Sequence, residues 1–218
     1  MIDFAKARRN MVDCQLRTNK VTDRALIAGF EETPRERFVV PSCQSIAYAD
    51  EKVPMGNGRY LAPPMVLARL LQELAVGPGD VVLDIGCGTG YSAVLLSRLA
   101  ATVVGLESDA ELAAKANELI TGLACDTAIV VEGPLAEGYA AQGPYDIILI
   151  AGEIGLVPDA ILDQLSEGGR LATILNEGEG QCRGVLMTRR GGVTSRRIVC
   201  DATAPPVPGF ERQAGFVF

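Results

Sequence analysis

The sequence predicts an α/β protein built on a doubly wound, mostly parallel sheet of seven strands. From residue 79 onward, short apolar runs typical of strands alternate with longer amphipathic runs typical of helices, which indicates βαβ units. The last part of the chain changes to two strand-like runs around a Gly-Gly turn, which predicts a C-terminal antiparallel hairpin. Residues 1 to 50 lack the alternation and are expected to form an N-terminal helical extension.

Local patterns predict each element in chain order. In the extension, a helix should begin at Asp23 and end before Pro34, because proline interrupts helical hydrogen bonding. The segment Met55 to Met65 contains two glycines and a Pro-Pro pair, and we expect a rigid bent loop rather than a helix or strand. The expected parallel strands are 81–85, 102–107, 127–133, 145–153 and 170–175, the intervening helices are 91–99, 109–120 and 157–169, and the hairpin strands are 184–190 and 195–202.

Composition excludes several classes of function. The net charge of −7 argues against a nucleic-acid partner or an anionic membrane surface. The N-terminal residues lack a signal-peptide pattern, and no apolar run reaches the roughly 18–20 residues that span a bilayer. The six cysteines are scattered without a C-x-x-C pair, which favours reduced thiols in a cytoplasmic protein over a metal cage or a disulfide framework.

The chain contains no histidine. This absence excludes Ser-His and Cys-His nucleophiles, histidine general bases and histidine-ligated metals. Any chemistry must use carboxylates, lysine, tyrosine, cysteine, backbone amides or a reactive substrate. We therefore assign no catalytic residue and no metal site.

The motif LDIGCGTGYSA follows a predicted buried strand and opens a helix. Its glycines, Gly86, Gly88 and Gly90, allow a tight turn and a close approach of the backbone to a ligand. The helix N-terminus adds unpaired amides that suit an anionic group. We interpret this turn as a ligand-binding site.

Two acidic residues indicate which ligand binds there. Asp84 lies at the end of the strand, where it would repel a pyrophosphate but suit an ammonium group. Glu107, about 20 residues further on, is placed to accept two ribose hydroxyls. A ligand with a ribose, an amine and a carboxylate but no phosphate is S-adenosyl-L-methionine. The pattern resembles that of class I S-adenosylmethionine-dependent methyltransferases, which have a Rossmann-like sheet and release S-adenosyl-L-homocysteine.

Longer stretches narrow the resemblance. Residues 8–39, 47–71, 82–99 and 143–175 are similar, in the same order, to protein-L-isoaspartate O-methyltransferases. The resemblance implies methyl transfer to the free α-carboxylate of isoaspartyl residues in damaged proteins, a protein-repair reaction whose ester product cyclises to a succinimide. The pattern along the chain predicts one compact unit, divided into residues 1–65, the extension and substrate loop, and 66–218, the cofactor-binding domain. The cofactor contacts implied are Asp84, Gly86, Cys87, Gly88, Gly90, Glu107, Ser108, Gly133, Pro134 and Leu135.

The substrate loop departs from the family pattern Gly-x-Gly-Gln-Thr-Ile-Ser-x-Pro, in which hydroxyls meet the substrate carboxylate. Arg59 replaces the glutamine, Tyr60 the threonine and Ala62 the serine. Two further departures are Pro134, at the position of the family's adenine-side acid, and Ala151, at a usual threonine. Glu132 and Glu137 are the possible substitutes for that acid.

These departures leave three functions open. The expected partner is a protein or peptide carboxylate, with Arg59, Tyr60 and Ala62 as the substrate-binding positions. The alternatives are a methyltransferase of the same fold acting on another acceptor, such as a small molecule, and a non-catalytic S-adenosylmethionine-binding protein. An acceptor role for Arg59 predicts that Arg59→Ala raises the acceptor KM without altering cofactor affinity. The sequence does not determine the oligomeric state.

Overall fold

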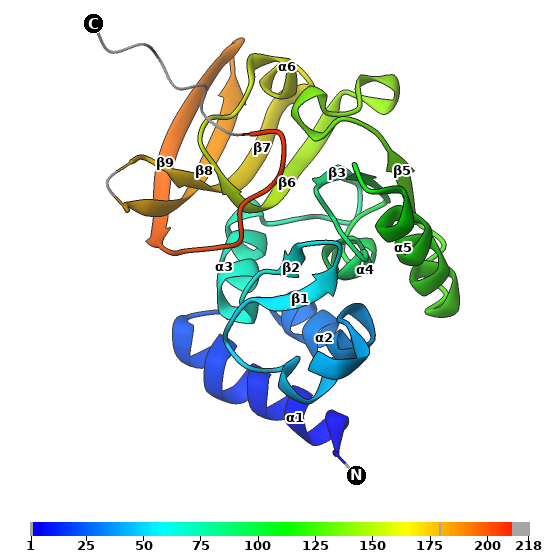
Figure 1. The fold of residues 1–218 in the computed structure, drawn as a ribbon. Helices are drawn as coiled ribbons and strands as arrows, with labels where there is room; N and C mark the ends of the chain where they lie inside the picture. The colour runs from blue at the N-terminus through cyan, green and yellow to red at the C-terminus, as the bar shows by residue number, and fades with distance from the viewer. Residues whose placement is uncertain (1, 179, 211–218) are drawn as a thin grey trace, which may run out of the picture.

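The computed structural model describes residues 2–178 and 180–210. Figure 1 shows one large sheet, which has seven strands in the order β5-β4-β3-β6-β7-β8-β9. Strands β3 to β7 pair in parallel, whereas β8 and β9 are antiparallel to their neighbours. The strands are β3 (Val81–Ile85), β4 (Thr102–Glu107), β5 (Ala128–Glu132), β6 (Tyr145–Ile154), β7 (Leu165–Asn176), β8 (Cys182–Arg190) and β9 (Val193–Asp201). The predicted fold class is confirmed.

The parallel strands have a hydrophobic core on each face of the sheet, and side chains from both faces of each strand contribute to them. On β3, Val82 belongs to one core, while Leu83 and Ile85 belong to the other, because successive side chains point to opposite faces. The first core is covered by α3 (Pro64–Leu74), α4 (Tyr91–Ser97) and α5 (Ala110–Gly122). The second core is covered by the one-turn helix α6 (Asp159–Leu162), the 3-10 turn η5 (Leu135–Glu137), and Val207 and Phe210 of the C-terminal segment. A further 3-10 turn, η6 (Ala140–Gln142), follows η5.

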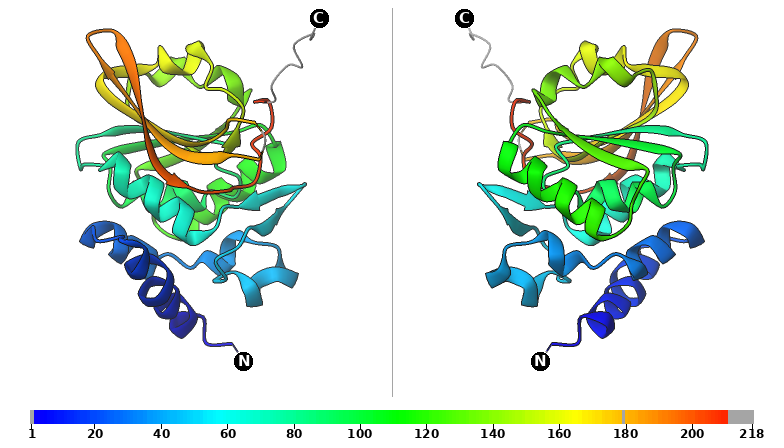
Figure 2. Two further views of the ribbon diagram at one scale, coloured as in Figure 1. Left: turned by 90° about the vertical axis from the view of Figure 1, so that its left-hand side faces the viewer. Right: turned by 90° about the vertical axis from the view of Figure 1, so that its right-hand side faces the viewer.

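The N-terminal region is helical, as predicted. Its elements are α1 (Phe4–Met11), the π-helix η1 (Val12–Leu16), η2 (Arg17–Asn19), α2 (Arg24–Glu32), η3 (Arg35–Phe38) and η4 (Pro41–Ile46). The Asp23 side chain caps α2 by accepting from the Leu26 amide at 2.8 Å, and the helix ends before Pro34. Both views of Figure 2 show these helices as a layer beyond α3, α4 and α5, on the side away from β8 and β9.

Two expectations about secondary structure are wrong. The segment expected to be a bent loop contains a small hairpin of β1 (Val53–Gly56) and β2 (Arg59–Leu61). Its turn residues Asn57 and Gly58 have φ of 48° and 72°, the geometry for which an Asn-Gly pair is the usual choice. That dipeptide is the sequence signal for this hairpin.

The helix expected over 157–169 is also shorter than predicted. It consists only of α6, and β7 already begins at Leu165. Leu165 pairs with Tyr145, and the Tyr145 amide donates to the Gln164 carbonyl at 2.8 Å. From Leu165 onward, the backbone therefore pairs with the long strand β6 instead of continuing the helix.

The C-terminal segment crosses the end of β6. In Figure 1 it leaves β9 and runs back toward β6 as a red trace. The Glu153 amide donates to the Pro205 carbonyl at 2.8 Å, and the Val207 amide donates to the Glu153 carbonyl at 2.9 Å. These bonds form a single parallel bridge that brings Val207 to the carboxyl edge of the sheet. Separately, no helix in residues 2–178 or 180–210 is long and apolar enough to cross a membrane.

Candidate active site

The glycine motif forms the turn between β3 and α4 at the carboxyl edge of the sheet. Gly86, Gly88 and Gly90 have φ of 71°, 57° and 87°, which glycine adopts more readily than other residues. The Gly86 amide donates to the Leu106 carbonyl of β4 at 2.7 Å, which fixes the turn against the neighbouring strand. Because β4 and β6 lie on opposite sides of β3, the strand order reverses here, as it does at ligand sites of doubly wound sheets.

Glu107 lies at the end of β4 and is fully buried. Its Oε2 atom accepts from the Gly88 amide at 2.8 Å, and its Oε1 atom accepts from the amides of Ser108 and Asp109 at 2.8 and 3.2 Å. Three backbone donors thus fix the carboxylate beside the glycine turn. This is the position at which the sequence places an acceptor for ribose hydroxyls.

Asp84 is fully buried within β3, next to the turn. Its Oδ2 atom accepts from the Ser92 hydroxyl at 2.6 Å, and its Oδ1 atom has no hydrogen-bond partner among the described residues. Burial is the main cause that raises the pKa of this carboxyl to about 7; the Ser92 hydrogen bond opposes the shift, and the charge of Glu107 adds to it. An unpaired buried carboxylate oxygen fits a ligand ammonium group.

The other predicted cofactor contacts lie around the same turn. Burial raises the pKa of the Cys87 thiol well above its usual range, which keeps it protonated. Gly133 follows β5, and its amide donates to the Glu107 carbonyl at 3.0 Å. Leu135 is buried and approaches Gly86 from the second core, whereas Pro134 is exposed. Glu132 and Glu137, considered as substitutes for the adenine-side acid, are both exposed.

The substrate-loop residues lie on the hairpin β1–β2 and just after it. Arg59 points into the turn, where its Nη1 atom is 2.5 Å from Glu107 Oε1 and its Nη2 atom donates to the Gly86 carbonyl at 3.0 Å. Tyr60 is 38% exposed, and Lys52 lies over its ring. Ala62 is buried. The structure brings these positions next to residues predicted to contact the cofactor. Their binding of an acceptor stays a prediction.

The hairpin and the C-terminal segment close the space above the turn. A Cβ atom added to Gly88 would lie 2.3 Å from Met55 Cε. A Cβ atom added to Gly86 would lie 3.0 Å from Val207 Cγ1 and 3.2 Å from Arg59 Nη2. A cavity of about 20 Å³ remains, lined by residues that include Tyr60, Ala62 and Ser92. Ligand pockets usually measure roughly 300–1,000 Å³. The buried acids and the glycine turn therefore fit an adenosyl amino acid chemically, but side chains of the chain itself occupy the space.

Arg35 holds the end of the substrate loop in place through hydrogen bonds to backbone carbonyls, a role that the sequence did not indicate. It is fully buried, and it donates to the carbonyls of Ala47 and Ala62, each at 2.7 Å. Its guanidinium lies 4.9 Å from the centre of the Tyr91 ring, and burial lowers its pKa. No local pattern distinguishes this arginine from an exposed one, since its partners lie 12 and 27 residues away.

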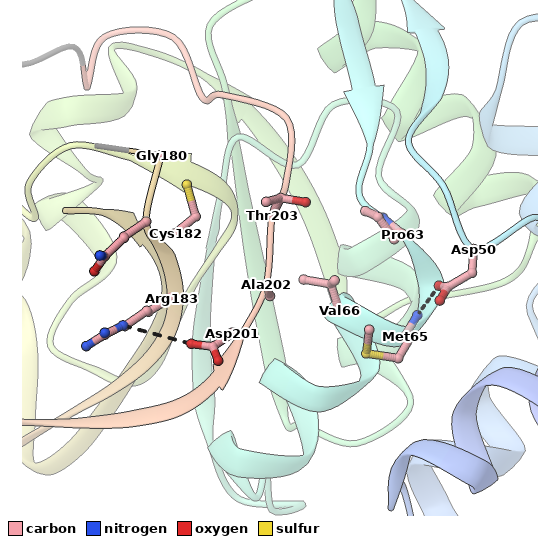
Figure 3. A pocket seen from close by; sticks show the side chains of 11 residues that line it. Asp50, Pro63, Met65, Val66, Gly180, Cys182, Arg183, Asp201, Ala202 and Thr203 are labelled. Atoms are coloured by element: carbon pink, nitrogen blue, oxygen red, sulfur yellow. Dashed lines mark hydrogen bonds and ion pairs between the residues drawn. The ribbon is translucent and has the colours of Figure 1, made fainter. Parts of the chain in front are cut away.

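Of the grooves beside the C-terminal segment, the two with the greatest volumes lie outside the glycine turn. Figure 3 shows the first, of about 590 Å³, between Met65 at the start of α3 and Cys182 at the start of β8. The second, of about 370 Å³, shares Asp50, Pro63 and Thr203 with the first. The two grooves thus adjoin along the segment that follows β9. Across residues 2–178 and 180–210, no group of three or more His, Cys, Asp or Glu side chains could hold a metal ion.

The family model of protein-L-isoaspartate(D-aspartate) O-methyltransferases matches residues 7–202. The chain belongs to this family. A protein-L-isoaspartate O-methyltransferase of Koribacter versatilis is 38% identical over 195 residues, which cover 89% of this chain and 88% of the relative. Another from Roseiflexus castenholzii is 34% identical over 209 residues, covering 95% and 94%.

Solved structures agree on the fold of this methyltransferase. A protein-L-isoaspartate O-methyltransferase superposes with a TM-score of 0.80 at 24% identity, covering 93% of this chain and 66% of the other. A candidate enzyme of that kind from Plasmodium falciparum, in complex with S-adenosyl-L-homocysteine, gives 0.78 at 18% identity, covering 95% and 99%. At this level of identity they support the fold alone. Family membership confirms the resemblance found in the sequence, the prediction of a methyltransferase and that of S-adenosylmethionine as cofactor.

Proposed function

We propose that this methyltransferase transfers a methyl group from S-adenosylmethionine to the carboxylate of isoaspartyl residues in proteins. The observation that carries the proposal is the buried Glu107 carboxylate beside the glycine turn, in a chain whose residues 7–202 match the family. The unpaired Asp84 oxygen adds a place for the donor's ammonium group. The alternatives, another acceptor or a non-catalytic binding protein, have less support because the curated relatives share one activity name.

The residues present suffice for this reaction without a general base. A carboxylate acceptor is already ionised at neutral pH, so no proton has to be removed before it attacks. When bound, the donor supplies a methyl group whose bond to the sulfonium sulfur breaks as a bond to the carboxylate oxygen forms. The protein's task is to align the two reactants and exclude water, which accounts for much of the catalysis in such reactions. The lack of histidine is consistent with this requirement.

A protein acceptor, rather than a small molecule, is supported by the two adjoining grooves. They extend along the C-terminal segment and reach Pro63, which directly follows Ala62 of the substrate loop. An extended peptide in these grooves would present one side chain at the loop while its flanking residues contact the walls. A cytoplasmic location is also part of the proposal, supported by six free cysteines within the described residues.

A methyl-ester assay tests the proposed function. The full chain is incubated with S-adenosylmethionine and either an isoaspartyl peptide or the same peptide with ordinary aspartate, and methanol released from the ester is collected by vapour diffusion. We expect transfer to the isoaspartyl peptide only. No transfer to that peptide by a preparation that binds the donor in calorimetry would refute the isoaspartyl assignment.

Restoring the loop hydroxyl should increase activity. Ala62 is buried and lines the small cavity above the glycine turn. Because a hydrogen bond to a charged group contributes about 1.5–3 kcal/mol, Ala62→Ser should raise kcat/KM for the isoaspartyl peptide roughly tenfold. The matched control is Ala101→Ser, which changes an exposed residue just before β4. This residue lies at the amino end of the parallel strands, away from the glycine turn, and the substitution should have no effect on kcat/KM. An unchanged kcat/KM in Ala62→Ser would contradict an acceptor contact at this position.

A further inference from the structure

We propose that Arg59 competes with the methyl donor for Glu107, so that the guanidinium must leave this carboxylate before the donor binds. The inference deepens the proposed function and rests on it for the identity of the donor. It differs from the acceptor role expected from the sequence, because it predicts an effect of Arg59 on donor affinity in the absence of any acceptor.

The first support is the number of donors already bound to Glu107. Its Oε1 atom accepts from Arg59 Nη1 and from the amides of Ser108 and Asp109, and it lies 3.3 Å from the Ser108 hydroxyl. Its Oε2 atom accepts from the Gly88 amide. A carboxylate offers about four lone-pair positions. Oε1 is therefore fully occupied while Arg59 remains bound, and only one position, on Oε2, is left for the ribose hydroxyls.

The second support is the space that the guanidinium fills. Arg59 Nη2 donates to the Gly86 carbonyl and lies 3.2 Å from the position where a Cβ atom of Gly86 would be. Gly86 is one of the three glycines that allow a ligand to approach the backbone of the turn. Arg59 thus occupies the ligand's place at the turn and at the acid together. Val207 closes the same position from the C-terminal segment.

The third support is that the Arg59 side chain is long and starts from an exposed edge. Arg59 begins β2 and directly follows the turn residues Asn57 and Gly58, both of which are exposed. The guanidinium reaches inward from there, and its side chain is 10% exposed. Rotation about its side-chain bonds can remove it from Glu107 without displacing the sheet. Since a donor that must first displace a resident group binds with reduced apparent affinity, Arg59 lowers the affinity measured in solution.

Titration calorimetry with S-adenosyl-L-homocysteine, without acceptor, tests the inference on the full chain. Arg59→Gln introduces the family residue and should bind about tenfold more tightly than the wild type, as expected if roughly one molecule in ten has the site open. Arg59→Lys keeps a cation but cannot make both contacts, and should bind more tightly by a smaller factor. The matched control Arg98→Gln removes a surface ion pair with Glu32 and should bind like the wild type.

Opposite outcomes overturn the inference. If both Arg59 variants bind the ligand with unchanged or weaker affinity, Arg59 is a neutral or supporting contact of the donor site. Thermal unfolding without ligand provides a check on folding, and Arg59→Lys carries the test if Arg59→Gln is unfolded. Because no acceptor is present, a failure of the isoaspartyl assay leaves the result unaffected, whereas absence of binding in every variant would refute the donor assignment itself.

Discussion

Glu107→Ala should weaken binding of S-adenosyl-L-homocysteine by about a hundredfold or more. The carboxylate is fully buried and is fixed by the amides of Gly88, Ser108 and Asp109. The ribose hydroxyls of the ligand would donate to it, and each hydrogen bond to a charged group contributes about 1.5–3 kcal/mol. Calorimetric titration measures the loss, and circular dichroism should show a retained fold.

The following helix offers a matched control. Glu118 lies on α5, and its side chain is exposed. Glu118→Ala should leave the affinity unchanged. Equal effects of the two substitutions, or none from Glu107→Ala, would show that the ribose subsite lies elsewhere.

The two members of the Arg59–Glu107 pair should act in opposite directions. Removing the acid should weaken donor binding, while removing the arginine should strengthen it. A pair whose only role is to stabilise the fold would not produce this reversal. Both substitutions should lower the stability of the ligand-free protein, because each leaves a largely buried charge without its partner.

Asp84→Asn should stabilise the ligand-free protein at alkaline pH. Burial raises the pKa of Asp84 to about 7 from an ordinary value of 3.8. Between these values the folded state binds more protons than the unfolded state, so the stability contributed by this group falls as pH rises through the window and stays low above it. Asparagine removes the titration. The variant should match the wild type near about pH 4 and exceed it by about 2–4 kcal/mol at about pH 8, as measured by urea unfolding.

The same substitution should weaken donor binding. An ammonium group near the unpaired Oδ1 atom favours the ionised carboxylate, so the wild type should bind the donor more tightly as pH rises through about 7. Asp84→Asn should bind less tightly at about pH 8 and lose this dependence. Asp126→Asn, at an exposed position, serves as the control. Retained pH dependence in Asp84→Asn would assign it to another group.

Several site features were predictable because they depend on neighbours in sequence or on strand ends. Gly86, Gly88 and Gly90 follow a strand directly, and their positive φ values agree with the turn expected from their spacing. Asp84 and Glu107 lie at the ends of adjacent parallel strands, so the sheet topology alone brings them together. The glycine turn and the two acids could therefore be predicted from the order of the strands along the chain and from where each strand ends.

The other half depends on contacts between distant residues. Arg59 meets Glu107 across 48 positions, and an arginine after an Asn-Gly turn looks locally like a solvent-facing residue. Val207 reaches Gly86 only because the segment after β9 pairs with β6. Local propensity does not specify which long side chain fills a crevice.

By itself, the sequence determined the positions of the parallel strands along the chain, the glycine turn, its two acids and the resemblance to the family. Periodicity and the adjacency of strand ends encode these features locally. Only the tertiary structure decided that Arg59 and Val207 pack against Gly86 of the turn. The same is true of the hydrogen bond from Arg35 to the Ala62 carbonyl of the substrate loop. These contacts arise from packing three separate segments against one sheet edge, where the free energy of burying a charge depends on every neighbour.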